Sequence, residues 1–186
     1  MLWVGALSAC RTACDNCWLA RGLSFAVNIE ISDQQSCIQA DRPRMLRAAE
    51  AILRDAGASD AQLSIALVDD PTIHALNRRF LAHDYPTDVL SFLLHRDGVV
   101  LEGEVIASAE TARRAAAGYG WTADDELLLY VVHGTLHLVG HDDASDEQRE
   151  AMRAREREYL ALVGVRVRGE SSSIYGDHTA ISDKSP

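Results

Sequence analysis

The segment HGTLHLVGHDD, residues 133–143, places two histidines four residues apart within an otherwise apolar stretch. From Leu127 to Val139 nearly every residue is apolar, a pattern typical of a helix that is buried on all sides. Thr122 is the expected N-cap of this helix, with Asp125 as its capping partner. Such a helix needs a core around it, so we expect the chain to fold as a globular domain.

Length and composition fit one domain of this kind, because the chain has 186 residues, of which 47% are hydrophobic and 25% are charged. The 18 Lys and Arg residues against 28 Asp and Glu residues give a formal net charge of −10. This charge excludes a uniformly basic nucleic-acid-binding surface but not a local basic groove. No run of about 18 apolar residues occurs, so no membrane-spanning segment is predicted.

The N-terminal segment indicates neither a signal peptide nor a metal cluster. MLWVGALSAC has no basic region before its apolar core, which argues against a signal peptide. Cys10, Cys14 and Cys17 lie close together, but the fourth cysteine, Cys37, is too distant in sequence to complete a four-ligand cluster. Four cysteines so placed do not form a disulfide framework either, so a reducing cytoplasm is the expected setting.

Hydrophobic periodicity predicts a single α+β domain with a mixed four-stranded sheet and about five helices. The expected strands are residues 25–31, 62–68, 89–94 and 101–108, with the last two joined as a hairpin through HRDG at 95–98. The expected helices are residues 42–56, 70–81, 108–117 closed by Gly118 and Gly120, the helix after Thr122, and one starting near Ser145. We assign residues 1–22 to an extension, residues 23–165 to the domain and residues 166–186 to a disordered tail.

The histidine pair has the spacing of two metal ligands. Residues four apart in an α-helix lie on one face, so the rings of His133 and His137 can converge on one point. Gly140 favours the left-handed conformation that ends a helix, which allows Asp143 to return toward the pair. His141 is the alternative third ligand, since a continued helix would stack it above His137.

Two imidazole nitrogens and one carboxylate oxygen leave a fourth tetrahedral position for water, which is typical of catalytic rather than structural zinc. We therefore expect one zinc ion per chain, bound by His133, His137 and Asp143. A hydrogen-bonded core residue is the ordinary explanation for one buried histidine, but it does not account for two at this spacing.

Three motifs resemble those of the YbeY endoribonuclease, or rRNA maturation factor, family. HGTLHLVGHDD is similar to the family's HGxLHLxGYDH, LNRRFLAHDYPTDVLSF at 76–92 to its LNxxYRxxxxPTDVLSF, and GEVIAS at 103–108 to its GDIxIS. Together they cover about residues 25–160 in the same order. His141 stands in place of the family's tyrosine, Asp143 in place of its third histidine ligand, and Leu81 in place of an arginine that helps to engage RNA phosphates.

The resemblance implies a zinc-dependent, single-strand-specific endoribonuclease that acts in ribosomal RNA maturation and ribosome quality control. It implies ribosomal RNA and the small ribosomal subunit as partners, a cytoplasmic location and a monomeric chain. Asp88, Ser91 and Glu104, which lie in the matched motifs, are candidates for the substrate groove. Arg78, with Arg79 beside it, could replace the missing arginine at the phosphate.

The group that transfers protons is not identified, although Glu104 and Asp142 are candidates. Two other functions stay open. One is a metzincin-like metalloprotease, whose ligand helix has the same spacing but carries a glutamate base where this chain has Gly134. The other is a zinc-containing ribosome assembly factor that binds RNA without cutting it.

Overall fold

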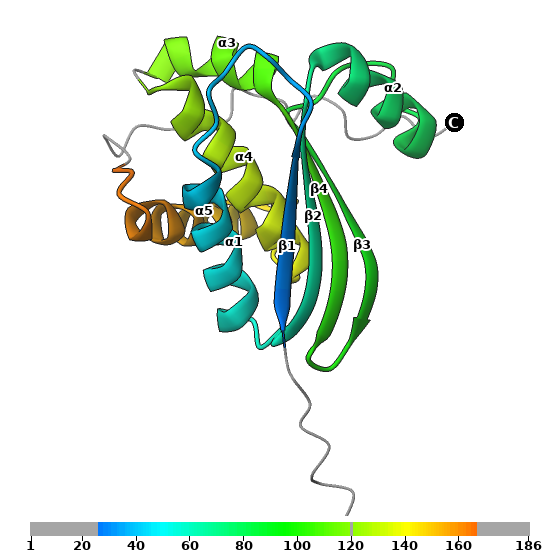
Figure 1. Ribbon diagram of the computed structural model, residues 1–186, viewed down its shortest axis with the longest axis vertical. Coiled ribbons are helices and arrows are strands. Elements are labelled where there is room, and N and C mark those ends of the chain that lie inside the picture. The colour runs from blue at the N-terminus through cyan, green and yellow to red at the C-terminus, as the bar shows by residue number, and fades with distance from the viewer. Residues whose placement is uncertain (1–25, 120, 167–186) are drawn as a thin grey trace, which may run out of the picture.

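The computed structural model describes residues 26–119 and 121–166 (Figure 1). The predicted N-terminal extension with Cys10, Cys14 and Cys17 lies outside the described residues, as does the predicted tail from residue 167 onward. The strands are β1 Val27–Asp33, β2 Asp60–Val68, β3 Val89–Asp97 and β4 Val100–Ser108. The helices are α1 Arg42–Asp55, α2 Asp70–Leu81, α3 Ala109–Tyr119, α4 Ala123–Leu138 and α5 Asp146–Leu162.

The four strands form one mixed sheet in the order β1-β2-β4-β3. β1 pairs with β2 and β2 with β4 in parallel, whereas β3 and β4 are antiparallel neighbours. β3 is therefore an edge strand; it contains an irregularity between Leu93 and His95, and its last five residues are exposed. The single α+β domain with a mixed four-stranded sheet and five helices is confirmed.

The sheet has a thick apolar layer on one face and a thin one on the other. On the first face α1 and α4 pack against the strands, α3 and α5 pack against α4, and together these elements form the main core (Figure 1). On the other face a small cluster of Val68, Ile73, Leu90 and Ile106 joins α2 to the sheet. Among the described residues, no helix combines the length and the apolar character needed to cross a membrane.

Helix α4 is the centre of the main core, as its sequence predicts. Twelve of its residues are buried, and Thr122 caps it by accepting a hydrogen bond from the backbone N–H of Asp125. The helix approaches the sheet closely at two glycines. A Cβ at Gly134 would lie 2.7 Å from Cγ1 of Val105, and one at Gly103 would lie 2.8 Å from Cδ1 of Leu138.

Several predicted boundaries were wrong: β1 is Val27–Asp33 rather than 25–31, β2 begins at Asp60 rather than at 62, and the ends of β3 and α3 also differ. β3 continues through Asp97, so the hairpin turn is Gly98 and Val99 rather than residues 95–98; Gly98 has the positive φ (+55°) that the first position of a two-residue hairpin turn requires. α3 continues through Gly118 to Tyr119, because one glycine weakens a helix without ending it. Gly120 lies outside the described residues.

We expect Gly134→Ala to lower the free energy of unfolding by about 1–2 kcal/mol. The added methyl would gain about 1 kcal/mol of helix propensity but would overpack the core against Val105, Val89 and Ser91, at a cost of about 1–3 kcal/mol. Urea denaturation measures the change. Gly103→Ala is the control and should lose less, because its new methyl meets the flexible end of Leu138. A Gly134→Ala variant as stable as the parent would contradict the close packing of α4.

Candidate metal centre

The loop between α4 and α5 is fixed at both ends by hydrogen bonds. Gly140 has φ +99°, and the N–H groups of Gly140 and His141 donate to the carbonyl oxygens of His137 and Leu136, at 3.0 and 3.1 Å. This is the glycine-terminated helix end that the sequence predicts. At the other end Ser145 and Gln148 form a capping box that begins α5. The loop thus turns back over α4.

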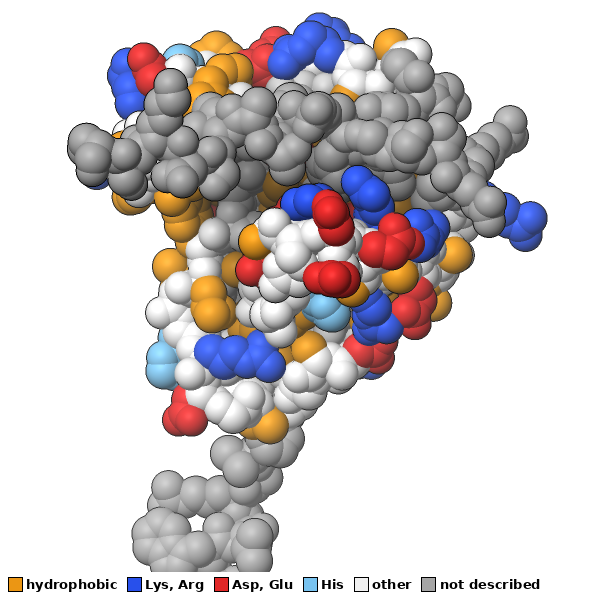
Figure 2. All heavy atoms as spheres, turned by 180° about the vertical axis from the view of Figure 1, so that it is seen from behind, with side chains coloured by type: hydrophobic (Ala, Val, Ile, Leu, Met, Phe, Trp, Pro, Cys, Tyr) orange, Lys and Arg blue, Asp and Glu red, His pale blue; other side chains and the backbone are white. Residues whose placement is uncertain are grey.

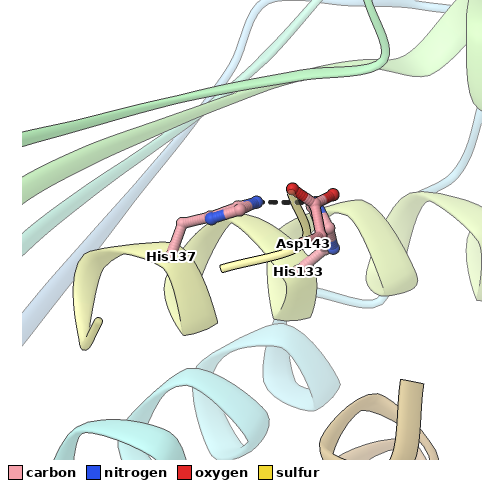
Figure 3. Close-up of side chains that lie close together, drawn as sticks. All are labelled: His133, His137 and Asp143. Atoms are coloured by element: carbon pink, nitrogen blue, oxygen red, sulfur yellow. Dashed lines mark hydrogen bonds and ion pairs between the residues drawn. The ribbon is translucent and has the colours of Figure 1, made fainter. Parts of the chain in front are cut away.

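This turn brings Asp143 to the two histidines of α4, and the three side chains point toward one another (Figure 3). Nε2 of His133 lies 2.9 Å from Nε2 of His137 and 3.8 Å from Oδ2 of Asp143. One ligand atom from each residue lies within 4.8 Å of the other two. Metal–ligand bonds of zinc place two ligands of a tetrahedron about 3.3 Å apart, and the two measured distances lie on either side of that value.

Hydrogen bonds on the far side of each ring fix which nitrogen carries the proton. Nδ1 of His133 donates to Oε1 of Glu156 at 2.7 Å, and Nδ1 of His137 donates to the carbonyl oxygen of His141 at 3.0 Å. Each ring thus carries its proton on Nδ1. In the neutral rings both Nε2 atoms are therefore unprotonated, and their lone pairs point toward the same position. Lone pairs 2.9 Å apart repel unless a positive charge lies between them, and a proton or a metal ion satisfies that need.

The electrostatics of the two rings differ. Burial alone would lower the pKa of His133, but its hydrogen bond and charge attraction with Glu156, together with the charges of Asp88 and Asp143, raise that pKa overall. Burial and the neighbouring charge of His133 lower the pKa of His137. A proton in this pair is therefore favoured on His133 rather than on His137. A divalent cation in the same place would displace it.

His141 contributes its backbone rather than its side chain. Its carbonyl oxygen accepts a hydrogen bond from His137, and its N–H donates to the carbonyl oxygen of Leu136. Its imidazole does not belong to the cluster of His133, His137 and Asp143 found among the described residues. Asp142 accepts from the backbone N–H of Asp143 at 2.8 Å. The geometry thus favours Asp143 over His141 as third ligand.

Two buried glutamates next to the cluster were missed by the sequence analysis. Glu156 of α5 is 0% exposed, and Glu126 of α4 is 2% exposed. Glu156 lies within the buried stripe Met152, Tyr159 and Leu160, at the helical spacing of core positions. An acidic residue at a core position was the signal in the sequence that could have identified both glutamates. Glu156 lies inside an apolar stripe, and Glu126 lies in a helix buried on all sides.

Glu126 is held in an environment that disfavours its charge. Burial, with the negative charges of Asp88 and Glu156, raises its pKa to about 7, although a hydrogen bond with Tyr130 acts in the opposite direction. One of its carboxyl oxygens has no hydrogen-bond partner within the described part of the chain. A carboxyl that titrates near neutrality beside a candidate metal centre has the properties of a proton carrier.

The four candidate groove residues fall on opposite faces of the sheet. Asp88 lies close enough to His133 for its charge to act on that ring, and Ser91 packs against Gly134 of α4. Glu104 lies between Gly103 and Val105, whose positions face α4, so its side chain points to the other face. Arg78 belongs to α2, which packs on that other face. The fold therefore brings Asp88 and Ser91, but not Glu104 or Arg78, to the side of the cluster.

Gly134 also excludes the protease alternative. In metzincin-like enzymes the residue after the first histidine is a glutamate that accepts a proton. Here even a Cβ at that position would lie within 3.0 Å of Val105, Ser91 and Val89. The chain has no room for that glutamate.

Two histidines and one carboxylate at the end of a buried helix, with the carboxylate 44% exposed, form a group that could hold a metal ion, and this donor set is of the kind found in metal-dependent hydrolases. The family model of "Endoribonuclease YbeY" matches residues 29–164. The chain belongs to the YbeY endoribonuclease family.

Individual relatives agree with this assignment. An "Endoribonuclease YbeY" of Rhodopirellula baltica is 45% identical over 131 residues, which cover 69% of this chain and 68% of the relative. One from Desulfitobacterium hafniense is 39% identical over 127 residues, covering 63% of this chain and 81% of the relative. The solution structure of TM1509 from Thermotoga maritima has a TM-score of 0.53 and 28% identity, covering 73% of this chain and 89% of that protein.

We expect Glu126→Gln to stabilise the protein at pH 8 by about 2–3 kcal/mol and to have little effect at pH 5. The folded-state pKa of about 7 lies above the ordinary value of 4.5, so the folded state binds the proton more tightly and stability falls as pH rises from about 4.5 to 7. Glutamine cannot ionise and escapes this loss. Urea denaturation of parent and variant at both pH values measures it, with exposed Glu102→Gln as control. An identical pH dependence in parent and Glu126→Gln would refute the assignment.

Proposed function

We propose that this chain is a zinc-dependent endoribonuclease that cleaves single-stranded RNA during the maturation and quality control of ribosomal RNA in the cytoplasm. Membership of the YbeY family and the endoribonuclease activity for which its relatives are named support hydrolysis of RNA. The observation that carries the proposal is the convergence of His133, His137 and Asp143 on one point, with both Nε2 lone pairs directed there. We propose that it acts at the small ribosomal subunit and that it does so as a monomer.

Zinc is the proposed ion because the donor set contains imidazole nitrogen and carboxylate oxygen in a small, four-coordinate arrangement. Calcium and magnesium prefer six or more oxygen ligands, which this cluster does not offer. When bound, the ion supplies Lewis acidity, which activates water and offsets negative charge at a phosphodiester.

The chain's own residues orient this centre. Glu156 and the carbonyl of His141 hold the two rings with Nε2 facing Asp143. Arg149 donates to the carbonyl oxygen of Asp143 at 3.1 Å, which holds the ligand loop over α4. Glu126, which is buried in α4 and whose pKa is raised to about 7, is the proposed reservoir for a proton.

The surface charge limits how RNA can bind. With a net charge of −10 the protein as a whole repels a polyanion. On the visible part of the face in Figure 2, Lys and Arg side chains lie among Asp and Glu side chains, without a broad basic area. We therefore propose that a few local cations and contacts to the bases, rather than a broad basic face, hold the RNA.

A second candidate is a ribosome assembly factor that binds RNA without cutting it. Leu81 favours this second function. Its side chain is 46% exposed on α2, at the position where the family motif has an arginine that helps to engage RNA phosphates. One experiment separates the two functions: incubation of the zinc-loaded protein with single-stranded ribosomal RNA, with His133→Ala beside it. Cleavage by the parent alone supports the endoribonuclease. Binding without cleavage supports the assembly factor, and equal cleavage by both proteins would reveal a contaminating nuclease.

We expect the purified protein to contain about one zinc per chain and Asp143→Ala to lose most of its zinc affinity, because the cluster then keeps only two ligands. Asp143→His should retain zinc, since imidazole replaces the carboxylate as a ligand. His141→Ala should bind zinc like the parent, because His141 acts through its backbone carbonyl. Elemental analysis and competition with a chromogenic chelator measure these values. Loss of zinc in His141→Ala with full retention in Asp143→Ala would assign the third position to His141.

We also expect Glu156→Ala to lower zinc affinity about 10- to 100-fold, because the carboxylate that orients His133 and fixes its tautomer is removed. Glu156→Gln should lose less, since its amide oxygen still accepts from Nδ1. Glu158→Ala, on the exposed side of the same helix, is the matched control and should not change the affinity. Chelator competition measures all three variants, and equal affinity in Glu156→Ala and the parent would contradict the role of this carboxylate.

A further inference from the structure

The end of α2 and the loop that follows it expose several aromatic rings. Phe80 is 56% exposed and Tyr85 is 40% exposed, and His83 between them is also exposed. We call Phe80, His83 and Tyr85 the aromatic surface. These three exposed rings fall within six residues of the chain, and exposed apolar side chains that lie near one another can mark a binding site.

Two rings of the aromatic surface stack on each other, and the third, Phe80, packs edge-on against Phe92 of β3 with centroids 5.6 Å apart. His83 and Tyr85 lie nearly parallel, with centroids 5.4 Å apart and an interplanar angle of 14°. The guanidinium of Arg79 lies 5.2 Å from the centroid of Phe80, in a cation–π contact. Flat aromatic faces and a neighbouring guanidinium are what proteins offer to unpaired nucleic-acid bases.

Local charge is compatible with an RNA ligand. Arg78 and Arg79 are exposed next to the rings. The acid in this loop, Asp84, lies 2.9 Å from Nε2 of His74 and 3.9 Å from the guanidinium of Arg78, so its charge is offset. The aromatic surface thus does not carry the net negative charge of the whole chain.

The backbone of this loop is held in place and leads to the metal centre. Ala82 ends α2 in a left-handed conformation (φ 59°), and the side-chain amide of buried Asn77 donates to the carbonyl oxygen of Tyr85 at 2.8 Å. Asp88, whose charge acts on His133, follows three residues later. Three residues span at most about 10 Å, so the backbone of Tyr85 lies within about 10 Å of the backbone of Asp88. Figure 1 shows α2 at the end of the sheet where β3 begins.

We propose that the aromatic surface of Phe80, His83 and Tyr85 binds unpaired RNA bases by stacking and so selects single-stranded substrate for the metal centre. The inference rests on the proposed function and adds the source of its strand selectivity. A base inside a duplex has no free face to stack on a side chain, whereas an unpaired base does. Stacking also depends little on sequence, because every base has a π face.

Tyr85 gives the cleanest test, because the loop is held through its carbonyl oxygen and not through its ring. The zinc-loaded protein is assayed with a single-stranded oligoribonucleotide that contains 2-aminopurine, which reports stacking by fluorescence quenching. In Tyr85→Ala we expect KM to rise about tenfold with kcat unchanged. The protein concentration that gives half-maximal quenching should rise by the same factor. Tyr85→Phe keeps the ring and should stay within about twofold of the parent. Leu162→Ala, which removes an exposed apolar side chain on α5, is the control and should not change either value.

The outcomes separate this inference from the proposed function. Cleavage by the parent with an unchanged KM and unchanged quenching in Tyr85→Ala would overturn the stacking role and leave the aromatic surface to a protein partner. An equal loss in Tyr85→Phe would also overturn it, because a hydroxyl contact would then be responsible. A parent that neither binds nor cleaves RNA would refute both proposals. A fall in cleavage of single-stranded RNA in Tyr85→Ala without a fall for duplex RNA would support the selectivity directly.

Discussion

The hydrogen bond between His133 and Glu156 is the interaction on which the arrangement of this site depends. Glu156 is 0% exposed, and a buried carboxylate is stable only where a positive charge or a hydrogen-bond donor accompanies it. The bond joins α4 to α5 across 23 residues of sequence, and removing one member of a buried pair costs about 3–5 kcal/mol. The site and the packing of the two helices are therefore one structural unit, in which the ligand ring is also a core residue.

The sequence predicted the elements of the fold well, because the signals are local. Alternation marks the strands, the i and i+4 spacing marks the histidine pair, and Gly140 marks the turn that returns Asp143. The sequence favoured Asp143 through Gly140 but left His141 open, so it did not decide the choice between the two. It depends on the path of a short loop, which the hydrogen bonds of Gly140 at one end and the capping box at Ser145 at the other determine.

The remaining errors concern residues that are distant in sequence. Glu156 was missed because its partner is on another helix, although its position in an apolar stripe was visible. Glu104 was grouped with Asp88 and Ser91 because all three lie in matched motifs. Which face of a sheet a strand residue occupies depends on how the sheet packs against the helices, and a change of one position reverses it. That information appears only when the strand is placed against α4.

The edge position of β3 has a consequence for solubility. An edge strand presents unpaired backbone groups to any other strand, and such edges are routes to aggregation unless something obstructs them. Along its outer side β3 has no neighbouring strand among the described residues. Its outer half exposes Leu93 and Leu94, which are 51% and 67% exposed, beside His95, Arg96 and Asp97. The irregularity after Leu93 and the adjacent charged side chains are therefore what oppose sheet extension between molecules at this apolar edge.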